Sequence, residues 1–546
     1  MHKWIICSAW PYLDGRPHIG TFMHLLSADV YSRYLRMLGE EVVSVSGSDE
    51  HGTPIEVEAL RLGSSPKELS NRYHDTMLKL LDAYMIKLDN YTRTESKVHI
   101  QFVRDFYLRL EKNGYIYPKV ENQLYCEYDK RFLPDRFVEG ICPYCGAPGA
   151  RGDQCDSCGR LLEPTKLIEP KCVICGKTPV IKETKQWFFD LPSLSNEIQS
   201  YIERNKNLPE NARNFSINWL KEGLQARAVT RDNRWGIPAP FKGADNKTIY
   251  VWMEAVLGYL SAVKELEDTK GSNLFEFFWK DKESRSVFFI GKDNIPFHTI
   301  ILPALLIASK EGYALPWQVS STEFVLFEGK KFSKSKHIGI WMDEAMTIAP
   351  PEYWRFVMMY LRPEIRDANF TWSEFDRMVN DELNDVLGNF INRVLSFVER
   401  FFDSKVPDAG DLNHESKSIL LAVSEAWNQY RSNMDAFAIR EALKIMVDLA
   451  RKGNEYMSST EPWLLVKNKN NRQSASTVLY TCCQVVYTLA IMMYPFMPSS
   501  AEKLLRMLGL DYKVIKAEVA GHAALSPGHK IGRVSQLFSK VQIPKA

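Results

Sequence analysis

The chain has 546 residues, of which 45% are hydrophobic and 25% are charged. This length allows three or four domains with well-buried cores, and the composition is that of an ordinary globular protein. The formal net charge is only +2, so the field of the whole molecule indicates no polyanionic partner. Any contact with nucleic acid must therefore use local basic patches.

Two strands and a helix are predicted at the N-terminus. Residues 1–9 are too short for a signal peptide and continue directly into Pro11. A short apolar strand is predicted over residues 4–8, a helix over residues 18–37 that ends at Gly39, and a second strand over residues 42–45. This order predicts a doubly wound parallel sheet, whose ligands bind at the carboxyl ends of the strands.

Residues 115–230 interrupt this pattern and are interpreted as an insertion. Gly, Pro and Cys are concentrated here, and seven of the ten cysteines lie within one stretch of it. In a chain without a signal peptide, such cysteines indicate metal sites in a reducing, cytoplasmic compartment rather than disulfides. Three pairs have CxxCG spacing: Cys142 with Cys145, Cys155 with Cys158, and Cys172 with Cys175.

The first two pairs form the sharper candidate metal site. Their four thiolates can surround one ion tetrahedrally, which is the geometry that Zn²⁺ prefers. Four protein ligands leave no open position, so the predicted zinc is structural. This set is Cys142, Cys145, Cys155 and Cys158.

The α/β pattern resumes after the insertion and then gives way to helices. A helical stretch begins at Tyr250, and residues 287–291 are a strand of the parallel-sheet type. From about residue 376 the chain has long amphipathic helices. The apolar run 478–497 contains polar residues and Pro495, so it is interpreted as a buried bundle helix, and no membrane contact is expected. The predicted fold class is α/β: a Rossmann-like parallel-sheet domain with a zinc-knuckle insertion and a C-terminal α-helical bundle.

Two distant motifs suit the binding of phosphate. His18 begins a predicted helix, where free amides and the helix dipole favour phosphate, and its imidazole can donate to phosphate oxygens. Gly20 allows a flat ring to approach the backbone. The motif Lys331-Phe332-Ser333-Lys334-Ser335 lies in a loop with four lysines that can close on a triphosphate. Taken alone, the first motif is equally an ordinary helix start, and the second a solvated basic loop.

Together the two motifs match those of class I aminoacyl-tRNA synthetases. The chain resembles methionyl-tRNA synthetases, in the zinc-containing form with archaeal-like knuckles, and the resemblance covers essentially the whole chain. Besides the two motifs and the knuckles, it rests on Ala9-Trp10-Pro11-Tyr12, Asp49-Glu50-His51-Gly52-Thr53-Pro54, Tyr250-Val251-Trp252-Met253-Glu254-Ala255, Gly291-Lys292-Asp293 and Glu461-Pro462-Trp463.

The resemblance implies a ligase that activates L-methionine with ATP and Mg²⁺ and transfers it to the 3′ end of tRNA(Met), for both initiation and elongation. The family's first motif usually ends in a second histidine, where this chain has Thr21. Either the other catalytic groups suffice, or His24, one helical turn further on, helps. The implied catalytic residues are His18, Lys331 and Lys334, and the implied ATP-binding residues are His18, Gly20, Gly291, Asp293, Lys331, Ser333 and Lys334.

The resemblance also implies a methionine pocket. Asp49 is the expected carboxylate for the substrate ammonium group, and aromatic walls suit a polarizable sulfur atom. Without the resemblance, the aromatic residues would be interpreted as core. Trp10, Asn294 and Leu302 vary within the family, and Trp10 could fill space that Leu302 leaves open. The residues expected to line the pocket are Tyr12, Trp252, Ala255, Tyr259 and His298.

A second zinc site and an anticodon site are implied as well. The second metal set is Cys126, Asp129, Cys172 and Cys175, in which Asp is a harder ligand than Cys and the knuckle glycine is missing. One or two zinc ions are therefore expected. By resemblance, Trp463 stacks on a base of the CAU anticodon while Asn389 and Arg393 bond to base edges. Without the resemblance, those two residues belong to an ordinary amphipathic helix.

The resemblance divides the chain into five segments and leaves three rivals. Residues 1–114 and 231–320 are the halves of the catalytic domain, 115–230 the connective insertion, 321–375 the stem-contact region with the lysine loop, and 376–546 the anticodon-binding domain. No further oligonucleotide-binding domain follows, so a monomer is expected.

Synthetases for Leu, Ile or Val usually carry a far larger insertion, and a small nucleotidyltransferase needs no such helical domain. An inactive tRNA-binding paralogue is suggested by Thr21 alone, and the intact lysine loop argues against it.

Overall fold

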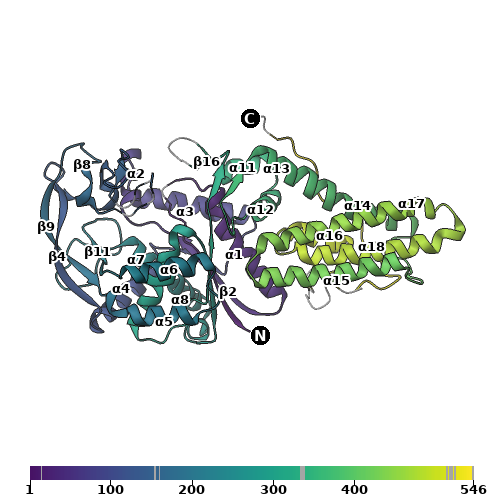
Figure 1. The fold of residues 1–546 in the computed structure, drawn as a ribbon, viewed down its shortest axis with the longest axis horizontal. Coiled ribbons are helices and arrows are strands. Elements are labelled where there is room, and N and C mark those ends of the chain that lie inside the picture. The colour runs from purple at the N-terminus through teal and green to yellow at the C-terminus, as the bar shows by residue number, and fades with distance from the viewer. Residues whose placement is uncertain are drawn as a thin grey trace.

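The structure is a computed structural model of the whole chain. It describes residues 1–546 except 14, 153–154, 156, 159, 161, 333–337, 512–514, 516–520, 522–523 and 544–546. The molecule is elongated (Figure 1). The insertion lies at one end, the parallel sheet is in the middle, and the helical bundle extends to the other end.

A five-stranded parallel sheet forms the centre of the fold, in the order β14-β13-β1-β2-β3. The chain leaves β1 in one direction through β2 and β3, and in the other through β13 and β14, so the strand order reverses between β1 and β13. The carboxyl ends at this reversal are where a doubly wound sheet binds its ligands. The strands are β1 (Lys3–Ser8), β2 (Glu41–Ser48), β3 (Asn90–Arg93), β13 (Arg285–Gly291) and β14 (Gln318–Thr322), which confirms the predicted strands.

Helices cover both faces of this sheet because alternate residues of a strand point to opposite sides. Trp4 and Ile6 of β1 pack into one hydrophobic core with α1 (Ile19–Met37), as predicted, and α3 (Pro66–Ala83). Ile5 and Cys7 pack into a second core. That core includes α4 (Lys97–Lys112), α8 (Gly258–Lys270), α9 (Leu274–Trp279), η5 (Phe297–Ile301) and α10 (Leu302–Ser309). Shorter elements near the strand ends are α2 (Thr53–Leu62), β11 (Thr230–Arg231), β12 (Thr248–Ile249), α7 (Val251–Ala255) and η4 (Lys292–Asn294).

The insertion is built on a long pair of antiparallel strands and carries a small core of its own. Strands β4 (Ile116–Cys126) and β9 (Val180–Phe189) pair in a sheet of order β10-β9-β4-β5, and a second sheet has the order β7-β6-β8. The buried cysteines lie in the core between them. The other elements are β5 (Arg131–Phe132), η1 (Asp135–Phe137), β6 (Val138–Ile141), β7 (Ala150–Arg151), η2 (Pro164–Lys166), β8 (Ile168–Cys172), η3 (Pro192–Leu194), α5 (Ser195–Arg204), α6 (Glu210–Glu222) and β10 (Arg227–Ala228).

A short linking region connects the sheet to the bundle. Arg355 of this region is fully buried, and its guanidinium bonds to Asp29 of α1 at 2.8 Å and to the Phe496 carbonyl at 2.7 Å. One continuous core therefore runs from α1 into the bundle. The region comprises β15 (Val325–Phe327), β16 (Lys330–Lys331), α11 (Met342–Ile348), α12 (Pro351–Tyr360), β17 (Ala368–Phe370), α13 (Trp372–Asp376) and η6 (Arg377–Gly388).

The C-terminal region is the predicted helical bundle. Its helices are α14 (Asn389–Phe401), α15 (His414–Asp435), α16 (Ile439–Thr460), α17 (Pro462–Leu465), η7 (Lys469–Asn471), α18 (Arg472–Met493) and α19 (Pro498–Met507). Among the described residues, Lys469–Met493 is long and apolar enough to cross a membrane by length and composition, and its apolar window is entirely buried inside the protein. The prediction of a buried bundle helix is therefore confirmed.

Candidate active site

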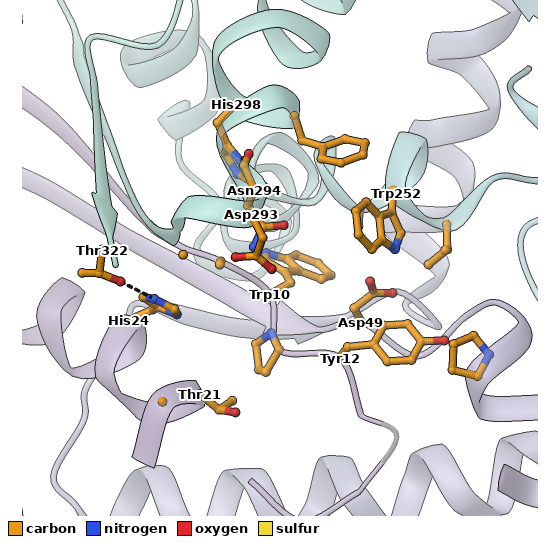
Figure 2. Close-up of a pocket in the computed structure, with 18 of the residues that line it drawn as sticks. Trp10, Tyr12, Thr21, His24, Asp49, Trp252, Asp293, Asn294, His298 and Thr322 are labelled. Carbon is orange, nitrogen blue, oxygen red and sulfur yellow. Dashed lines mark hydrogen bonds between the residues drawn. The ribbon is translucent and has the colours of Figure 1, made fainter. Parts of the chain in front are cut away.

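A cavity of about 560 Å³ opens at the reversal point of the sheet. It is lined by the ends of β1, β2, β13 and β14 together with α1 and α7, as Figure 2 illustrates. Eleven of the residues predicted for ATP and methionine line this one cavity: Tyr12, His18, Gly20, Asp49, Trp252, Ala255, Tyr259, Gly291, Asp293, His298 and Lys331. The other two, Ser333 and Lys334, lie outside the described residues.

His18 is the N-cap of α1, with its imidazole folded back onto the helix. Its Nδ1 accepts a hydrogen bond from the Gly20 amide at 3.1 Å. A Cβ on Gly20 would come within 3.1 Å of that ring, so the glycine makes room for it. An Nδ1 that accepts leaves the ring proton on Nε2, and this nitrogen can then donate to a ligand.

The segments on both sides of the lysine loop hold His18 between them. Phe332 stacks on its imidazole with a centroid separation of 4.8 Å, and Trp341 lies 6.1 Å away on a tilted plane. The Ile19 amide also donates to the Ile340 carbonyl at 3.2 Å. Lys331, exposed on β16, completes this end of the cavity. The two sequence motifs, some three hundred residues apart, thus meet at one place.

Thr21 and His24 lie on the first turns of α1 and both line the cavity (Figure 2). The imidazole of His24 bonds through Nε2 to the Thr322 hydroxyl at 2.9 Å. Burial, together with the nearby charges of Arg362 and His18, lowers the pKa of His24 to about 3. A neutral His24 can supply a hydrogen bond to the site but no positive charge in place of the missing motif histidine.

Asp49 is the buried carboxylate of the cavity, with only 6% of its surface exposed. Burial raises its pKa well above the usual range, and repulsion from Glu254 adds to this, whereas His51 opposes it. Among the described residues, its Oδ1 has no hydrogen-bond partner. A buried carboxylate oxygen of this kind is costly unless a ligand pairs with it, and a cationic group fits.

Tyr259 and His298 form a fixed pair at the apolar end. His298 Nδ1 donates to the Asn294 carbonyl at 2.9 Å, so its Nε2 accepts from the Tyr259 hydroxyl at 2.8 Å. Burial lowers the pKa of His298 to about 4, although the Asn294 carbonyl opposes this, and the ring is therefore neutral at pH 7. Trp252 packs edge-on against Phe297 with ring centroids 4.7 Å apart.

Trp10 fills space that two glycines provide. A Cβ on Gly258 would lie 2.5 Å from the indole, and one on Gly47 would lie 2.8 Å from it. The indole also contacts the ring of His99, with centroids 5.5 Å apart. Leu302 is buried at the start of α10 and is absent from the described lining of the cavity. The space for Trp10 is thus explained by Gly47 and Gly258.

Sequence reasoning missed several residues of the cavity. Asp135 and Arg136 come from η1 of the insertion. Phe297 begins η5, Thr322 ends β14, and Phe324 follows that strand. The signal in the sequence was weak, because nothing in the knuckle region shows that η1 folds back over the cavity. Phe324 lies under two lysines, with Lys292 Nζ at 4.2 Å and Lys331 Nζ at 5.9 Å from its ring centroid.

The all-cysteine cluster has the arrangement expected of a metal site. The Sγ atoms of Cys142, Cys145, Cys155 and Cys158 all lie within 4.8 Å of one another. Burial raises the pKa of the Cys142 thiol, but hydrogen bonds from backbone amides outweigh it and lower the pKa to about 7. A thiolate at Cys142 is therefore accessible near neutral pH, as a metal ligand requires. A hydrogen bond from the Ala147 amide lowers the pKa of Cys145, but burial and the neighbouring thiols outweigh it and raise that pKa to about 12.

The mixed cluster has the same compactness. Cys126, Asp129, Cys172 and Cys175 also have ligand atoms within 4.8 Å of one another. Lys130, which occupies the place of the missing knuckle glycine, has φ +49°, close to the +72° of Gly146 and the +71° of Gly176. The knuckle turn is therefore formed without its glycine, and Asp129 faces the same centre as the three cysteines.

The residues predicted to read an anticodon lie at the far part of the bundle. Asn389 and Arg393 are one turn apart on α14, and Asn389 is exposed. The guanidinium of Arg393 lies 5.3 Å from the ring centroid of Trp463, which belongs to α17. The structure brings these side chains together, although α14 and α17 are separated by two long helices in sequence.

Comparison with known proteins agrees with this fold and site. The family described as "tRNA synthetases class I (M)" matches residues 4–395, and the one described as "Anticodon binding domain of methionyl tRNA ligase" matches residues 406–544. The methionine–tRNA ligase of Korarchaeum cryptofilum is 53% identical, covering 99% of this chain and 96% of its own. That of Ignicoccus hospitalis is 51% identical with the same coverage.

Solved structures show the same fold. The Mycobacterium tuberculosis methionyl-tRNA synthetase in complex with methionyl-adenylate superposes with a TM-score of 0.82 at 25% identity, covering 98% of this chain and all of that one. The parallel sheet, the cavity at its reversal point and the family match define a class I aminoacyl-tRNA synthetase. Within that class, the chain belongs to the methionine–tRNA ligases.

Proposed function

We propose that the cavity activates L-methionine with ATP and that the two ends of the cavity divide the work. Asp49 and the aromatic residues bind the amino acid, and His18, Gly20, Gly291, Asp293 and the lysine loop bind ATP. The observation that carries this assignment is one cavity with different ends. One end has neutral aromatic walls and the buried Asp49 carboxylate, whose Oδ1 has no partner among the described residues, and the other end has cationic groups.

At the amino-acid end, the ammonium group of methionine pairs with Asp49 Oδ1. The side chain of methionine then lies along Trp252, Ala255 and the Tyr259–His298 pair, with Tyr12 at the entrance. Sulfur packs well against aromatic edges, and a neutral His298 places no charge beside it. The cavity therefore favours an unbranched thioether.

At the phosphate end, the methionine carboxylate attacks the α-phosphate of ATP and pyrophosphate leaves. Charge spreads onto the transferring and leaving oxygens, and His18 Nε2–H, Lys331 and Lys334 stabilise it. Mg²⁺, when bound to ATP, neutralises phosphate charge. The adenylate then acylates the terminal adenosine of tRNA(Met). Little covalent chemistry is asked of the protein itself.

The two cysteine clusters are proposed to hold one structural Zn²⁺ each. Both have four ligand atoms at compact spacing, and neither leaves an open position for a substrate. The measurement is the zinc content of the purified protein by elemental analysis. Two ions per chain support the proposal, and one ion would limit it to the all-cysteine cluster.

Residues 376–546 are proposed to bind the anticodon, with Trp463 stacked on a base and Asn389 and Arg393 bonded to base edges. The segments 1–114 and 231–320 then form the catalytic domain, 115–230 the connective insertion, and 321–375 the stem-contact region. The protein is proposed to act as a cytoplasmic monomer.

Aminoacylation of tRNA transcripts tests this assignment. A transcript with the CAU anticodon is expected to accept methionine, and a matched transcript with one changed anticodon base is expected to lose at least about tenfold in kcat/KM, as the loss of one stacked base predicts. In Trp463→Ala, the difference between the two transcripts should shrink. Equal charging of both transcripts by the unaltered protein would contradict it.

A further inference from the structure

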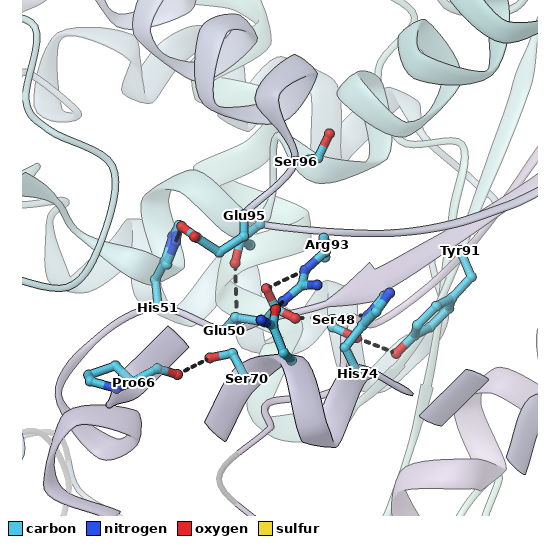
Figure 3. A network of polar contacts seen from close by, with 12 residues as sticks. Ser48, Glu50, His51, Pro66, Ser70, His74, Tyr91, Arg93, Glu95 and Ser96 are labelled. Atoms are coloured by element: carbon cyan, nitrogen blue, oxygen red, sulfur yellow. Dashed lines mark hydrogen bonds and ion pairs between the residues drawn. The ribbon is translucent and has the colours of Figure 1, made fainter. Parts of the chain in front are cut away.

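His51 lies two residues after Asp49, in the loop that follows β2, and its imidazole is held between the carboxylates of Glu254 and Glu95. Figure 3 shows His51 beside Glu95. Its Nδ1 is 2.5 Å from Glu254 Oε1, and its Nε2 is 2.8 Å from Glu95 Oε1. The ring is 1% exposed, and the Glu254 side chain is fully buried. Neither the ATP assignment nor the methionine assignment uses this residue.

The geometry restricts the protonation state of the ring. A neutral imidazole has one N–H and one lone pair, so one of its nitrogens would direct a lone pair at a carboxylate unless that carboxyl group carried a proton. Burial raises the pKa of Glu254, and the charge of His51 opposes this. When both nitrogens carry protons, each donates to one carboxylate and the buried charges are paired. Burial alone lowers the pKa of His51, but the two carboxylates outweigh it and raise the pKa to about 10.

Burial raises the pKa of the neighbouring Glu50 carboxylate to about 7, and the charges of Arg93 and His51 oppose this. That carboxylate pairs with Arg93, whose Nε is 2.9 Å from Glu50 Oε2, and it lies beside His74, Ser48 and Tyr91 in the network of Figure 3. The other groups that face His51 are Asp49 from its own loop and His99 from α4. Burial lowers the pKa of His99 to about 3, and the charge of His51 adds to this, so His99 is neutral.

The same contacts tie together three segments of the cavity wall. Asp49 and His51 share one loop, Glu254 lies on α7 two residues after Trp252, and Glu95 lies just before α4. The Tyr12 hydroxyl donates to the His51 carbonyl at 2.5 Å, which adds the segment after β1. The carboxylate end and the aromatic end of the amino-acid pocket are therefore joined through this one imidazole.

We propose that His51 is a positioning residue for methionine: as an imidazolium at neutral pH, it fixes the loop of Asp49 against α7 and offsets the negative charge of Glu254 beside the substrate ammonium group. This inference rests on the proposed role of Asp49. Burial and repulsion from Glu254 already raise the pKa of Asp49, and His51 opposes this. Without the imidazolium the pKa of Asp49 rises further, and a protonated Asp49 binds an ammonium group poorly.

The protonation state can be measured directly, independently of activity. In the full-length protein with ¹⁵N-labelled histidine, His51 is assigned by comparison with His51→Gln. Both ring nitrogens are expected to have imidazolium shifts throughout pH 6–9. A neutral tautomer at pH 8, or a titration midpoint near the ordinary histidine value of about 6.5, would overturn the proposal whatever the enzyme assay shows.

The functional arm uses Glu254→Gln, which keeps the shape of the side chain and removes one of the two charges. His51 should then titrate within pH 6–9. The methionine KM of this variant is divided by that of the unaltered protein at each pH, so that titration of the substrate's own amino group cancels. This ratio should rise with pH, with the same midpoint as His51, while the ATP KM stays within about twofold. Glu265→Gln is the matched control, because Glu265 bonds to Ser96 and Asn90 away from the cavity. A Glu254→Gln profile identical to that of the control would overturn the proposal.

His51→Gln gives the size of the effect. The methionine KM should rise at least about tenfold, as expected when one partner of a buried charge pair is removed, with the ATP KM changed by less than about twofold. Equal changes in both constants would mean a general structural role and would contradict positioning. If the unaltered protein shows no methionine-dependent exchange between ATP and pyrophosphate, the proposed function fails, while the NMR result still decides the charge of His51.

Discussion

The two ends of the cavity are built differently. At the amino-acid end, the functional side chains are buried and already held by other protein groups: His298 by Tyr259 and Asn294, and Asp49 within a loop tied to α7. At the phosphate end, Lys331 is exposed, and His18 stacks on Phe332 and accepts a hydrogen bond from the Gly20 amide. The selective end thus belongs to the core, and the charged end belongs to the surface.

This difference has a physical reason. Discrimination between similar apolar side chains needs walls that do not relax, and close-packed core residues provide them. Stabilisation of a polyphosphate needs several mobile cations that can approach the ligand, and burying them permanently would cost far more than keeping them solvated. Substitutions at the two ends should therefore change different kinetic constants.

The largest effect is expected at the phosphate end. Lys331→Ala and Lys334→Ala should each slow adenylate formation by two or more orders of magnitude, because each removes a cation that is proposed to stabilise the developing phosphate charge. Methionine binding, measured by equilibrium dialysis, should stay nearly intact. Lys282→Ala, which changes an exposed lysine before the amino end of β13, at the sheet edge opposite the cavity, is the control. Equal losses of rate and methionine affinity would remove the distinction between the two ends.

Asp49→Asn tests the amino-acid end. The change leaves the ammonium group of methionine without a charged partner in a buried place, which typically costs about 2–5 kcal/mol. The methionine KM should rise at least about thirtyfold, and the ATP KM should change little. Asp293→Asn, at the ATP end of the same cavity, should show the opposite pattern. A shared pattern in the two variants would contradict the proposed separation.

Tyr259→Phe should have a smaller effect at the same end. The lost hydroxyl leaves His298 Nε2 as a buried acceptor without its donor, a penalty of about 1–3 kcal/mol. The expected result is a roughly tenfold rise in methionine KM, with partial loss of preference over leucine. Tyr250→Phe provides a matched change in another residue that lines the cavity. If Tyr259→Phe changes neither the methionine KM nor the preference over leucine, the Tyr259–His298 pair does not select the side chain.

The smallest effect on catalysis is expected in the knuckles, because their predicted metal ligands do not line either end of the cavity. Asp129→Ala should lower the zinc content by about one ion per chain and reduce the thermal midpoint, because a structural metal contributes to folding. Both KM values should stay within about twofold. An unchanged zinc content would show that the mixed cluster holds no metal, and a changed ATP KM would link the insertion to the cavity.

Much of this arrangement could be predicted from the sequence, for reasons that differ between regions. The strands and α1 follow from strong local periodicity, and the all-cysteine cluster follows from spacing alone. The meeting of His18 with Phe332 and Trp341 could not be predicted from periodicity, because it joins segments some three hundred residues apart. The knuckle at Asp129 was obscured because Lys130 adopts a conformation that glycine usually supplies.

The charge network around His51 could not be predicted for the same reason, because it also joins distant segments. The motif Asp49-Glu50-His51-Gly52 indicated the carboxylate for methionine, but nothing in it indicates that His51 lies between Glu254 and Glu95, which belong to distant segments. Likewise, the place of Trp10 depends on two glycines, and only the folded chain brings Gly47 and Gly258 against its indole.

Methionine-dependent exchange between ATP and pyrophosphate tests the central claim most directly. The assay needs only the protein, ATP with Mg²⁺ and one amino acid, and leucine, isoleucine, valine and cysteine serve as controls. The account predicts exchange with methionine and none above background with the others at equal concentration. Absence of exchange with every amino acid, in folded and zinc-loaded protein, would contradict the account and would favour an inactive tRNA-binding protein in which Thr21 is the first residue to restore to histidine.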